Sequence, residues 1–315
     1  MNQQKNIHQP VLLKEVLDYL QPKHGESYLD VTAGYGGHAE AVLSRSGAPE
    51  KAVLVDRDSQ AVEALKKRFA KPGVKIVHRD FLTASGELAR EGRRFDMILA
   101  DLGVSSAHLE HATRGFSIKS PGPLDMRMDR RQQLTADQIV NSASEAELTR
   151  ILTDYGDEPK ARQIARRIIA ARPVKSTSQL AALVAKAWPL HYGRGKPGKS
   201  RIHPATRVFQ ALRIAVNDEL NQLGLSLPIW LGLLAPGGRL AIISFHSLED
   251  RLVKRFLAEH RATGYGGQLK VLTKKPVVAR DEEIVFNPRA RSAKLRAAVK
   301  IKTKRKDQRK AQNAY

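Results

Sequence analysis

A glycine-rich stretch next to a histidine offers the first chemistry in this sequence. Gly34-Tyr35-Gly36-Gly37-His38-Ala39 fits the G-x-G-x-x-G/A fingerprint of dinucleotide-binding loops. In such loops a ligand lies against bare backbone over the N-terminus of a helix. The same glycines also suit a tight turn that requires positive φ angles and binds nothing. The spacing therefore predicts a nucleotide-like ligand at Gly34, Gly36 and Gly37 without identifying it.

Two acids narrow the class of ligand. Asp30 comes just before the loop, where a carboxylate would repel a pyrophosphate. S-adenosylmethionine carries an α-ammonium and a sulfonium instead of phosphate, so an acid beside the loop favours it; a turn cap is the structural alternative for Asp30. Asp56 follows the next apolar run, at the place where an acid accepts hydrogen bonds from ribose hydroxyls.

Two further acids follow later apolar runs. Asp80 and Asp101 each end a strand-like segment, and Phe81 follows Asp80. Phe81 could stack on an adenine whose amine Asp80 binds, or it could be a core residue. Because parallel strands present their carboxyl ends at one edge of a sheet, the acids should gather there. The sequence therefore predicts a pocket for a cationic, amine-bearing nucleoside, S-adenosylmethionine.

The elements that must position these residues follow the rhythm of a parallel α/β sheet. Apolar runs that predict strands alternate with segments of helical periodicity. The expected strands are 27–32, 51–56, 74–80, 94–103, 236–247, 269–278 and 297–304, and the expected helices include 10–20, 38–46, 59–70 and 248–260. We therefore expect a Rossmann-like sheet formed by residues 1–111 and 213–302.

The rhythm stops between residues 112 and 212. That stretch has little strand character, and helical patterns cover 135–156, 158–173 and 177–189. We expect an inserted all-helical domain that recognises the substrate. Residues 303–315 are basic and polar, which is typical of a disordered tail.

Composition indicates the partner. The 315 residues carry 54 Lys and Arg against 32 Asp and Glu, a net charge of +22, and such an excess attracts nucleic acid. Cysteine is absent, in agreement with a reducing compartment. Neither a signal peptide nor a membrane span is evident. We expect a cytoplasmic protein with no membrane partner, and the sequence leaves its oligomeric state open.

Several longer motifs resemble one family. LDVTAGYGGHAEAVL, GPLDMRMD, HPATRVFQALRI and SFHSLEDR are distinctive, and the match covers nearly the whole chain. The sequence resembles the bacterial MraW family, the ribosomal RNA small-subunit methyltransferases H. Its members transfer a methyl group from S-adenosylmethionine to the N4 amine of a cytosine in 16S rRNA, near the ribosomal P site. The resemblance implies a class I methyltransferase sheet with a helical insert, and the small ribosomal subunit as partner.

The resemblance also implies donor-binding residues. They are Gly36, Gly37, His38, Asp56, Phe81, Asp101 and His108. His108 departs from the family pattern, which often has glutamine there, although a histidine also forms a hydrogen bond.

The chemistry requires a hydrogen-bond acceptor for the cytosine amine and a flipped target base. Asp101 is the candidate catalytic residue, although it could bind only the donor. The D/N-P-P-Y/F motif of many amino-methyltransferases is replaced by Asp101-Leu102-Gly103-Val104, so the aromatic partner of the base must lie elsewhere; the candidates are Phe116, Tyr192 and Phe245. His246 is a weaker catalytic candidate, which could instead belong to a helix cap formed by Ser247. The mechanism requires no metal.

Basic segments predict RNA contacts. Arg194, Lys196, Lys199 and Arg201 lie in a glycine-containing loop suited to phosphates. A second basic group surrounds the turn SPGPLD and comprises Arg114, Arg127, Arg130 and Arg131.

Three other functions remain open from the sequence. A DNA cytosine-N4 methyltransferase would share the pocket, but the missing proline-proline-aromatic motif argues against it. A nicotinamide dehydrogenase would use the same glycines, but Asp30 and the +22 charge disfavour it. A basic ribosome-assembly factor with a vestigial donor site is the third.

Overall fold

The chain divides into two compact units. The structure, a computed structural model, describes residues 10–70, 73–105, 108–109, 111–189, 203–262 and 267–301. Unit 1 combines Met1–Gly103 with Asn221–Tyr315, and unit 2 is Val104–Leu220. No helix of the described residues is long and apolar enough to cross a membrane.

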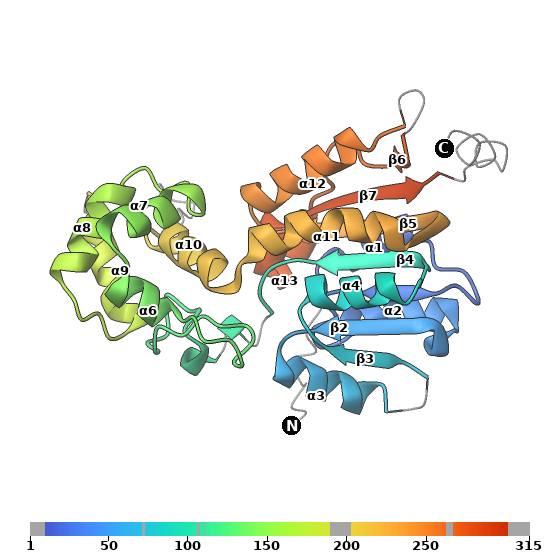
Figure 1. The fold of residues 1–315 in the computed structure, drawn as a ribbon, viewed down its shortest axis with the longest axis horizontal. Helices are drawn as coiled ribbons and strands as arrows, with labels where there is room; N and C mark the ends of the chain where they lie inside the picture. Colours follow the sequence, from blue (N-terminus) through green and yellow to red (C-terminus); the bar gives the residue numbers. More distant parts are fainter. Residues whose placement is uncertain are drawn as a thin grey trace. The chain divides into compact units, whose positions relative to one another are not determined.

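Unit 1 is built on a seven-stranded sheet in the order β3-β2-β1-β4-β5-β7-β6 (Figure 1). Strands β3, β2, β1, β4 and β5 are parallel, and β7 is antiparallel to both β5 and β6. The strands are β1 Tyr28–Asp30, β2 Ala52–Asp56, β3 Lys75–His78, β4 Phe95–Asp101, β5 Leu234–Ser244, β6 Leu269–Val271 and β7 Lys294–Lys300. This mixed sheet with its helices confirms the predicted Rossmann-like α/β fold.

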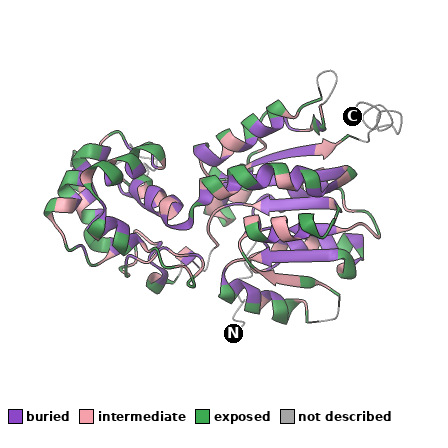
Figure 2. Cartoon of the chain, in the orientation of Figure 1, coloured by how far each residue is buried: buried purple, intermediate pink, exposed green. Residues whose placement is uncertain are grey.

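Helices cover both faces of this sheet. They are α1 Leu13–Leu20, α2 Gly37–Ser46, α3 Ser59–Arg68, α4 Phe81–Arg90, α11 Glu219–Leu233, α12 Ser247–Glu259 and α13 Asp281–Phe286, with short 3-10 turns η1 Pro49–Lys51 and η3 Pro288–Ser292. Alternate residues of β1 point to opposite faces: Tyr28 packs in the cluster with α1 and α2, and Leu29 in the cluster with α4 and α12. The central strands β1, β2 and β4 are therefore buried on both sides (Figure 2), which explains their continuous apolar runs, whereas the edge strands β3 and β6 are partly exposed.

Two expectations for unit 1 need correction. The strand expected at 74–80 ends at His78, because Asp80 caps α4 by accepting a hydrogen bond from Thr83 N at 2.8 Å. Helix α11 was not predicted, since apolar residues dominate its sequence without clear helical periodicity.

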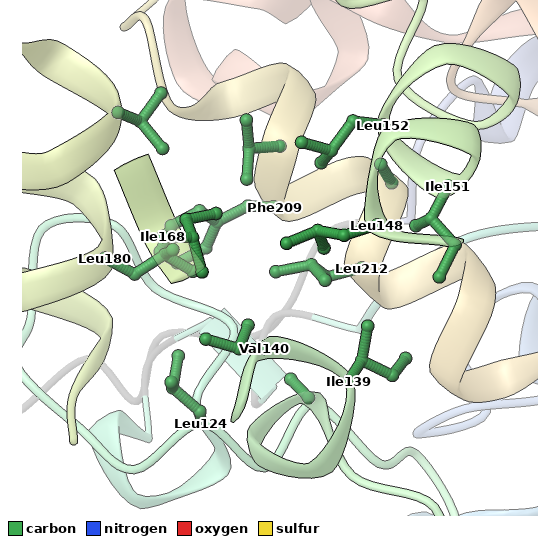
Figure 3. Packing of buried hydrophobic residues seen from close by; sticks show 14 of the residues in the cluster. Leu124, Ile139, Val140, Leu148, Ile151, Leu152, Ile168, Leu180, Phe209 and Leu212 are labelled. Carbon is green, nitrogen blue, oxygen red and sulfur yellow. The ribbon is translucent and has the colours of Figure 1, made fainter. Parts of the chain in front are cut away.

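The regular elements of unit 2's described residues are all helical, whereas residues 115–134 form turns and loops. Its helices are α6 Ala136–Ser142, α7 Glu145–Asp154, α8 Ala161–Ala170, α9 Thr177–Ala185 and α10 Thr206–Asn217, preceded by the 3-10 turn η2 Ala112–Arg114. The helical pattern at 135–156 forms two helices, because the Ser144 hydroxyl accepts from Glu147 N and starts a new one. Side chains from α6 to α10 share one core (Figure 3).

Candidate functional site

The glycine loop joins β1 to α2 and is tied to β2. Gly34 has φ +53° and Gly36 has φ +81°, angles that favour glycine. Gly34 N donates to Asp56 Oδ2 at 2.8 Å, and Asp58 N donates to Asp56 Oδ1 at 2.8 Å. The Asp56 carboxylate therefore holds both the loop and the turn that follows β2.

Close packing explains why Gly36 and Gly37 lack side chains. A Cβ on Gly36 would lie 2.7 Å from Phe69 Cε2, and one on Gly37 would lie 2.5 Å from Pro10 Cγ. Both distances are shorter than real Cβ contacts. These two glycines are therefore required by the protein's own packing, whether or not a ligand approaches them.

Asp30 lies beneath the loop and is 1% exposed. Its carboxylate accepts hydrogen bonds from the Tyr28 hydroxyl at 2.8 Å and from Thr32 N at 3.1 Å. Burial raises its pKa from 3.8 to about 6, although His38 and these two hydrogen bonds oppose the shift. Burial also raises the pKa of Tyr28, and the Asp30 charge adds to that shift. The contacts match the turn-cap alternative and make Asp30 an internal charge under the loop.

His38 and Asp101 carry polar atoms that the described residues leave unsatisfied. His38 is 6% exposed, and neither of its ring nitrogens makes a hydrogen bond with a described residue. Its Nε2 lies 3.5 Å from Asp101 Oδ2, while the buried Asp101 Oδ1 lacks a described partner. Asp101 N donates to Thr32 Oγ1 at 2.6 Å, which fixes the end of β4. Because buried polar groups normally find partners, these atoms mark a place for ligand groups.

The predicted acid–aromatic pair, Asp80 and Phe81, makes contacts within the fold. Asp80 Oδ1 and Oδ2 accept hydrogen bonds from Thr83 N and Thr83 Oγ1, both at 2.8 Å. The Phe81 ring is 8% exposed and meets Trp230 edge-on at 5.6 Å. These contacts account for Asp80 as a helix cap and for Phe81 as a core residue, the structural alternative. Donor binding by Phe81 stays a prediction.

His246 caps α12 directly. Its Nδ1 accepts from Glu249 N at 3.4 Å, and Glu249 Oε2 accepts from Phe245 N at 2.8 Å. The sequence had suggested Ser247 as the cap; the structure corrects this, because Ser247 is the first residue of the helix and His246 precedes it. The cap uses Nδ1, whereas the buried Nε2 lies 3.2 Å from Glu249 Oε1 and makes no hydrogen bond with a described residue. A role of His246 in chemistry stays a prediction.

Two predicted residues lie in unit 2. His108 is 5% exposed, accepts from Ser105 N at 3.3 Å and stacks on Phe116 at 5.0 Å between ring centroids. Phe116 is 6% exposed and belongs to the unit 2 core, so its contacts are those of a core residue. Tyr192, Arg194, Lys196, Lys199 and Arg201 lie outside the described residues, as does the tail 303–315.

Three of the arginines near SPGPLD make structural contacts. Arg114 is 2% exposed and donates to the carbonyls of Arg127 and Met128, both at 3.0 Å. Arg127 Nε donates to Asp125 Oδ1 at 2.7 Å, and Arg131 Nη2 donates to Asp129 Oδ2 at 2.7 Å. The guanidinium groups of these three arginines therefore donate hydrogen bonds to acceptors within unit 2.

Sequence reasoning missed Tyr28 and Thr32. Tyr28 donates to Asp30, and Thr32 accepts from the backbone of Asp101. The period of two in a strand puts Tyr28 and Asp30 on the same face, so that pair was detectable. The Thr32 contact joins β1 to β4, and only the strand order reveals it.

Comparison with known proteins identifies the family. The model of the MraW methylase family matches residues 5–301. The ribosomal RNA small subunit methyltransferase H of Cyanothece sp. is 49% identical over 299 residues, covering 94% of this chain and 95% of that protein. The ribosomal RNA small subunit methyltransferase H of Heliobacterium modesticaldum is 45% identical over 314 residues, covering 94% of this chain and 99% of that protein. The resemblance seen in the motifs is thus confirmed, and the chain belongs to the MraW methylase family.

Proposed function

We propose that this protein transfers a methyl group from S-adenosylmethionine to the N4 amine of a cytosine in 16S rRNA, near the ribosomal P site. The observation that carries the proposal is the pair of buried polar side chains, His38 and Asp101, whose unsatisfied atoms lie beside the glycine loop. Family membership and the names of the relatives support rRNA as the substrate class.

The carboxyl edge of the sheet fits the donor. S-adenosylmethionine supplies an electrophilic methyl group on a cationic sulfur. Asp30, Asp56 and Asp101 provide negative charge at the ends of β1, β2 and β4, which complements the donor's sulfonium and ammonium. Gly34, Gly36, Gly37 and His38 line the turn into α2, and we assign them to donor binding together with Asp56. Phe81 and His108 are assigned by resemblance alone.

Asp101 is assigned the chemical role. Its unsatisfied Oδ1 is available to accept a hydrogen bond from the cytosine N4–H, which directs the nitrogen lone pair toward the methyl carbon. The N–C bond forms as the S–C bond breaks, and N4 loses one proton. The Asp101 carboxylate is the acceptor for that proton. Thr32 holds the backbone of Asp101 in position.

The substrate is assigned from charge. The net charge of +22 favours a polyanion, and the four cations of residues 194–201 suit phosphate contacts. We assign substrate recognition to the helical insert predicted at 112–212, and the small ribosomal subunit is the proposed partner. We further propose that the tail from Lys300 to Lys310 adds nonspecific phosphate contacts.

A methyl-transfer assay tests the proposal. Radiolabelled S-adenosylmethionine is incubated with small ribosomal subunits that lack the modification, and the labelled nucleotide is mapped. We expect label on N4 of one cytosine of 16S rRNA. Folded protein that binds the donor but labels no rRNA cytosine would contradict the proposed function, and label on DNA would favour a DNA cytosine-N4 enzyme.

A further inference from the structure

One phenylalanine of unit 1 is exposed to an unusual degree. Phe286, the last residue of α13, is 82% exposed, and its neighbour Val285 is 74% exposed. The chain has eight phenylalanines, all within the described residues, and each of the other seven is buried or half-buried. Burying a side chain of this size stabilises a fold by about 1.5–3 kcal/mol. Together with Val285, Phe286 places two adjacent exposed apolar side chains at one end of α13, which makes this end a candidate contact surface.

The segment that carries Phe286 is anchored to the rest of unit 1. Ala290 and Ala293 are fully buried, and Ile284 packs against the same cluster, which also contains Leu12. Leu12 N donates to Glu283 Oε1 at 2.8 Å, so α13 is bonded to the chain just before α1. Phe286 is thus presented on a fixed base.

Sheet register locates this segment at the edge where the donor loop lies. Segment η3 leads directly into β7, whose first residue, Lys294, pairs with Ser244 at the end of β5. Ile243 of β5 in turn pairs with Asp101. Because neighbouring strands are about 4.8 Å apart, the start of β7 lies roughly 10 Å from the end of β4. Segment η3 therefore lies at the carboxyl edge of the sheet, the edge that also carries the proposed methyl-transfer site, and Phe286 precedes η3 by two residues.

Charge around Phe286 favours a polyanion. Residues 287–294 contain Arg289, Arg291 and Lys294 and no acid. Arg291 is exposed and Arg289 half-buried, whereas Lys294 faces Asp250 at 3.8 Å. The acids of α13, Asp281, Glu282 and Glu283, lie in its first turn, one helical turn before Phe286, and Glu283 is bonded to Leu12 N. An exposed aromatic ring next to arginines is the combination that binds single-stranded nucleic acid by stacking and phosphate contacts.

We propose that Phe286, with Arg289 and Arg291 of η3, forms a contact surface for the rRNA strand that carries the target cytosine. Phe286 stacks on an unpaired base next to the target, and the arginines contact the adjoining phosphates. This inference rests on the proposed function, since it names a part of the substrate contact for that reaction. It concerns a base next to the target, and the aromatic partner of the target base itself remains a separate question.

Binding measurements on the full-length chain test the contact. Phe286→Ala should weaken binding to deproteinised 16S rRNA by about 5- to 100-fold, because base stacking contributes about 1–3 kcal/mol. Phe286→Trp should keep the affinity, and its added fluorescence should be quenched by RNA. Arg291→Gln should reduce the salt dependence of binding. Donor affinity should stay unchanged in all three variants.

Two control variants lie at the opposite edge of the sheet. Arg90→Gln changes an exposed cation at the end of α4, and Ile301→Ala changes a residue, 37% exposed, just after β7. Both should bind rRNA as the unmodified protein does. A similar loss in these controls, or full affinity in Phe286→Ala, would overturn the inference.

The remaining outcomes separate the inference from its alternatives. If Phe286→Ala weakens binding to intact small subunits but not to deproteinised rRNA, the surface binds a ribosomal protein and the RNA assignment is wrong. If Phe286→Ala instead dissociates a dimer seen by sedimentation, the Phe286 surface binds a second copy of this chain, and its assignment to rRNA is again wrong. The unmodified protein could bind rRNA, lose affinity on Phe286→Ala and yet transfer no methyl group. That result would support the contact and contradict the proposed reaction.

Discussion

The polar residues at the glycine loop and the arginines of unit 2 are both clusters of charged side chains in the sequence. In the structure the two clusters differ in the hydrogen-bond partners of their polar atoms. His38 and Asp101 keep buried atoms without a described partner. Arg114, in contrast, donates to two main-chain carbonyls, and Arg127 is paired with Asp125. The difference teaches that clustered charge alone does not identify a binding site. Buried polar atoms without a described partner are a second, independent indication, because burying a polar group without a partner is costly.

The largest effect should come from Asp101. Replacement by alanine or asparagine should reduce kcat by about 10²- to 10⁴-fold, since a positioned proton acceptor contributes that much. Donor affinity, measured by calorimetry, should change far less. If donor binding is lost while the residual kcat at saturating donor stays normal, Asp101 binds only the donor, and the assigned chemical role is wrong.

Arg114 should matter for folding rather than for RNA. Arg114→Ala would leave the carbonyls of Arg127 and Met128 without their donor, so unit 2 should lose about 3–4 kcal/mol of unfolding free energy. Arg131→Gln is the matched control, because its ion pair is half exposed and should contribute less than about 1 kcal/mol. Denaturant titration measures both. A stable Arg114→Ala protein with weakened rRNA binding would reverse the comparison.

Asp30 should make both stability and donor binding depend on pH. Its folded pKa of about 6 lies above the ordinary value of 3.8, so the folded state holds its proton more tightly than the unfolded one. Stability should therefore fall as pH rises from about 4 to 6, by roughly 2–3 kcal/mol in total. The cationic donor prefers the carboxylate, so its affinity should rise over the same range. Asp30→Asn should abolish both slopes.

Thermal and donor titrations between pH 4.5 and 7.5 check this prediction. The Asp30→Asn variant should be more stable than the unmodified protein above pH 6, yet bind the donor more weakly there. Equal pH profiles for the two proteins would mean that Asp30 acts only as a turn cap.

The smallest effect is expected at His246. His246→Ala should lower stability by about 1 kcal/mol through loss of the α12 cap, and His246→Asn should restore it. Both variants should keep the normal kcat at saturating substrate, measured by methyl transfer. A loss of kcat in the asparagine variant, with stability restored, would give His246 a part in the reaction.

Much of unit 1 was predictable because its signals are local. The apolar runs and the glycine loop are continuous in sequence, acids end β1, β2 and β4, and the capping residue Asp58 is of an ordinary type. Helix α13 and the exposure of Phe286 were missed, since a short segment has too few residues for a periodic pattern. Asp80 was expected at the end of a strand but caps α4, because a strand end and a helix cap favour the same residue type.

The sequence by itself determined the family, the order of strands and helices along the chain and the excess of positive charge, because motifs, periodicity and composition are properties of the chain. Only the tertiary structure decided which polar groups are satisfied. Asp30, Asp101 and Arg114 are all charged residues in the sequence. The raised pKa of Asp30, the Asp101 Oδ1 that has no partner among the described residues and the two carbonyl contacts of the Arg114 guanidinium depend on neighbours from distant strands and loops. Burial and hydrogen bonding are set by those neighbours, and therefore so is the chemistry each group has left to offer.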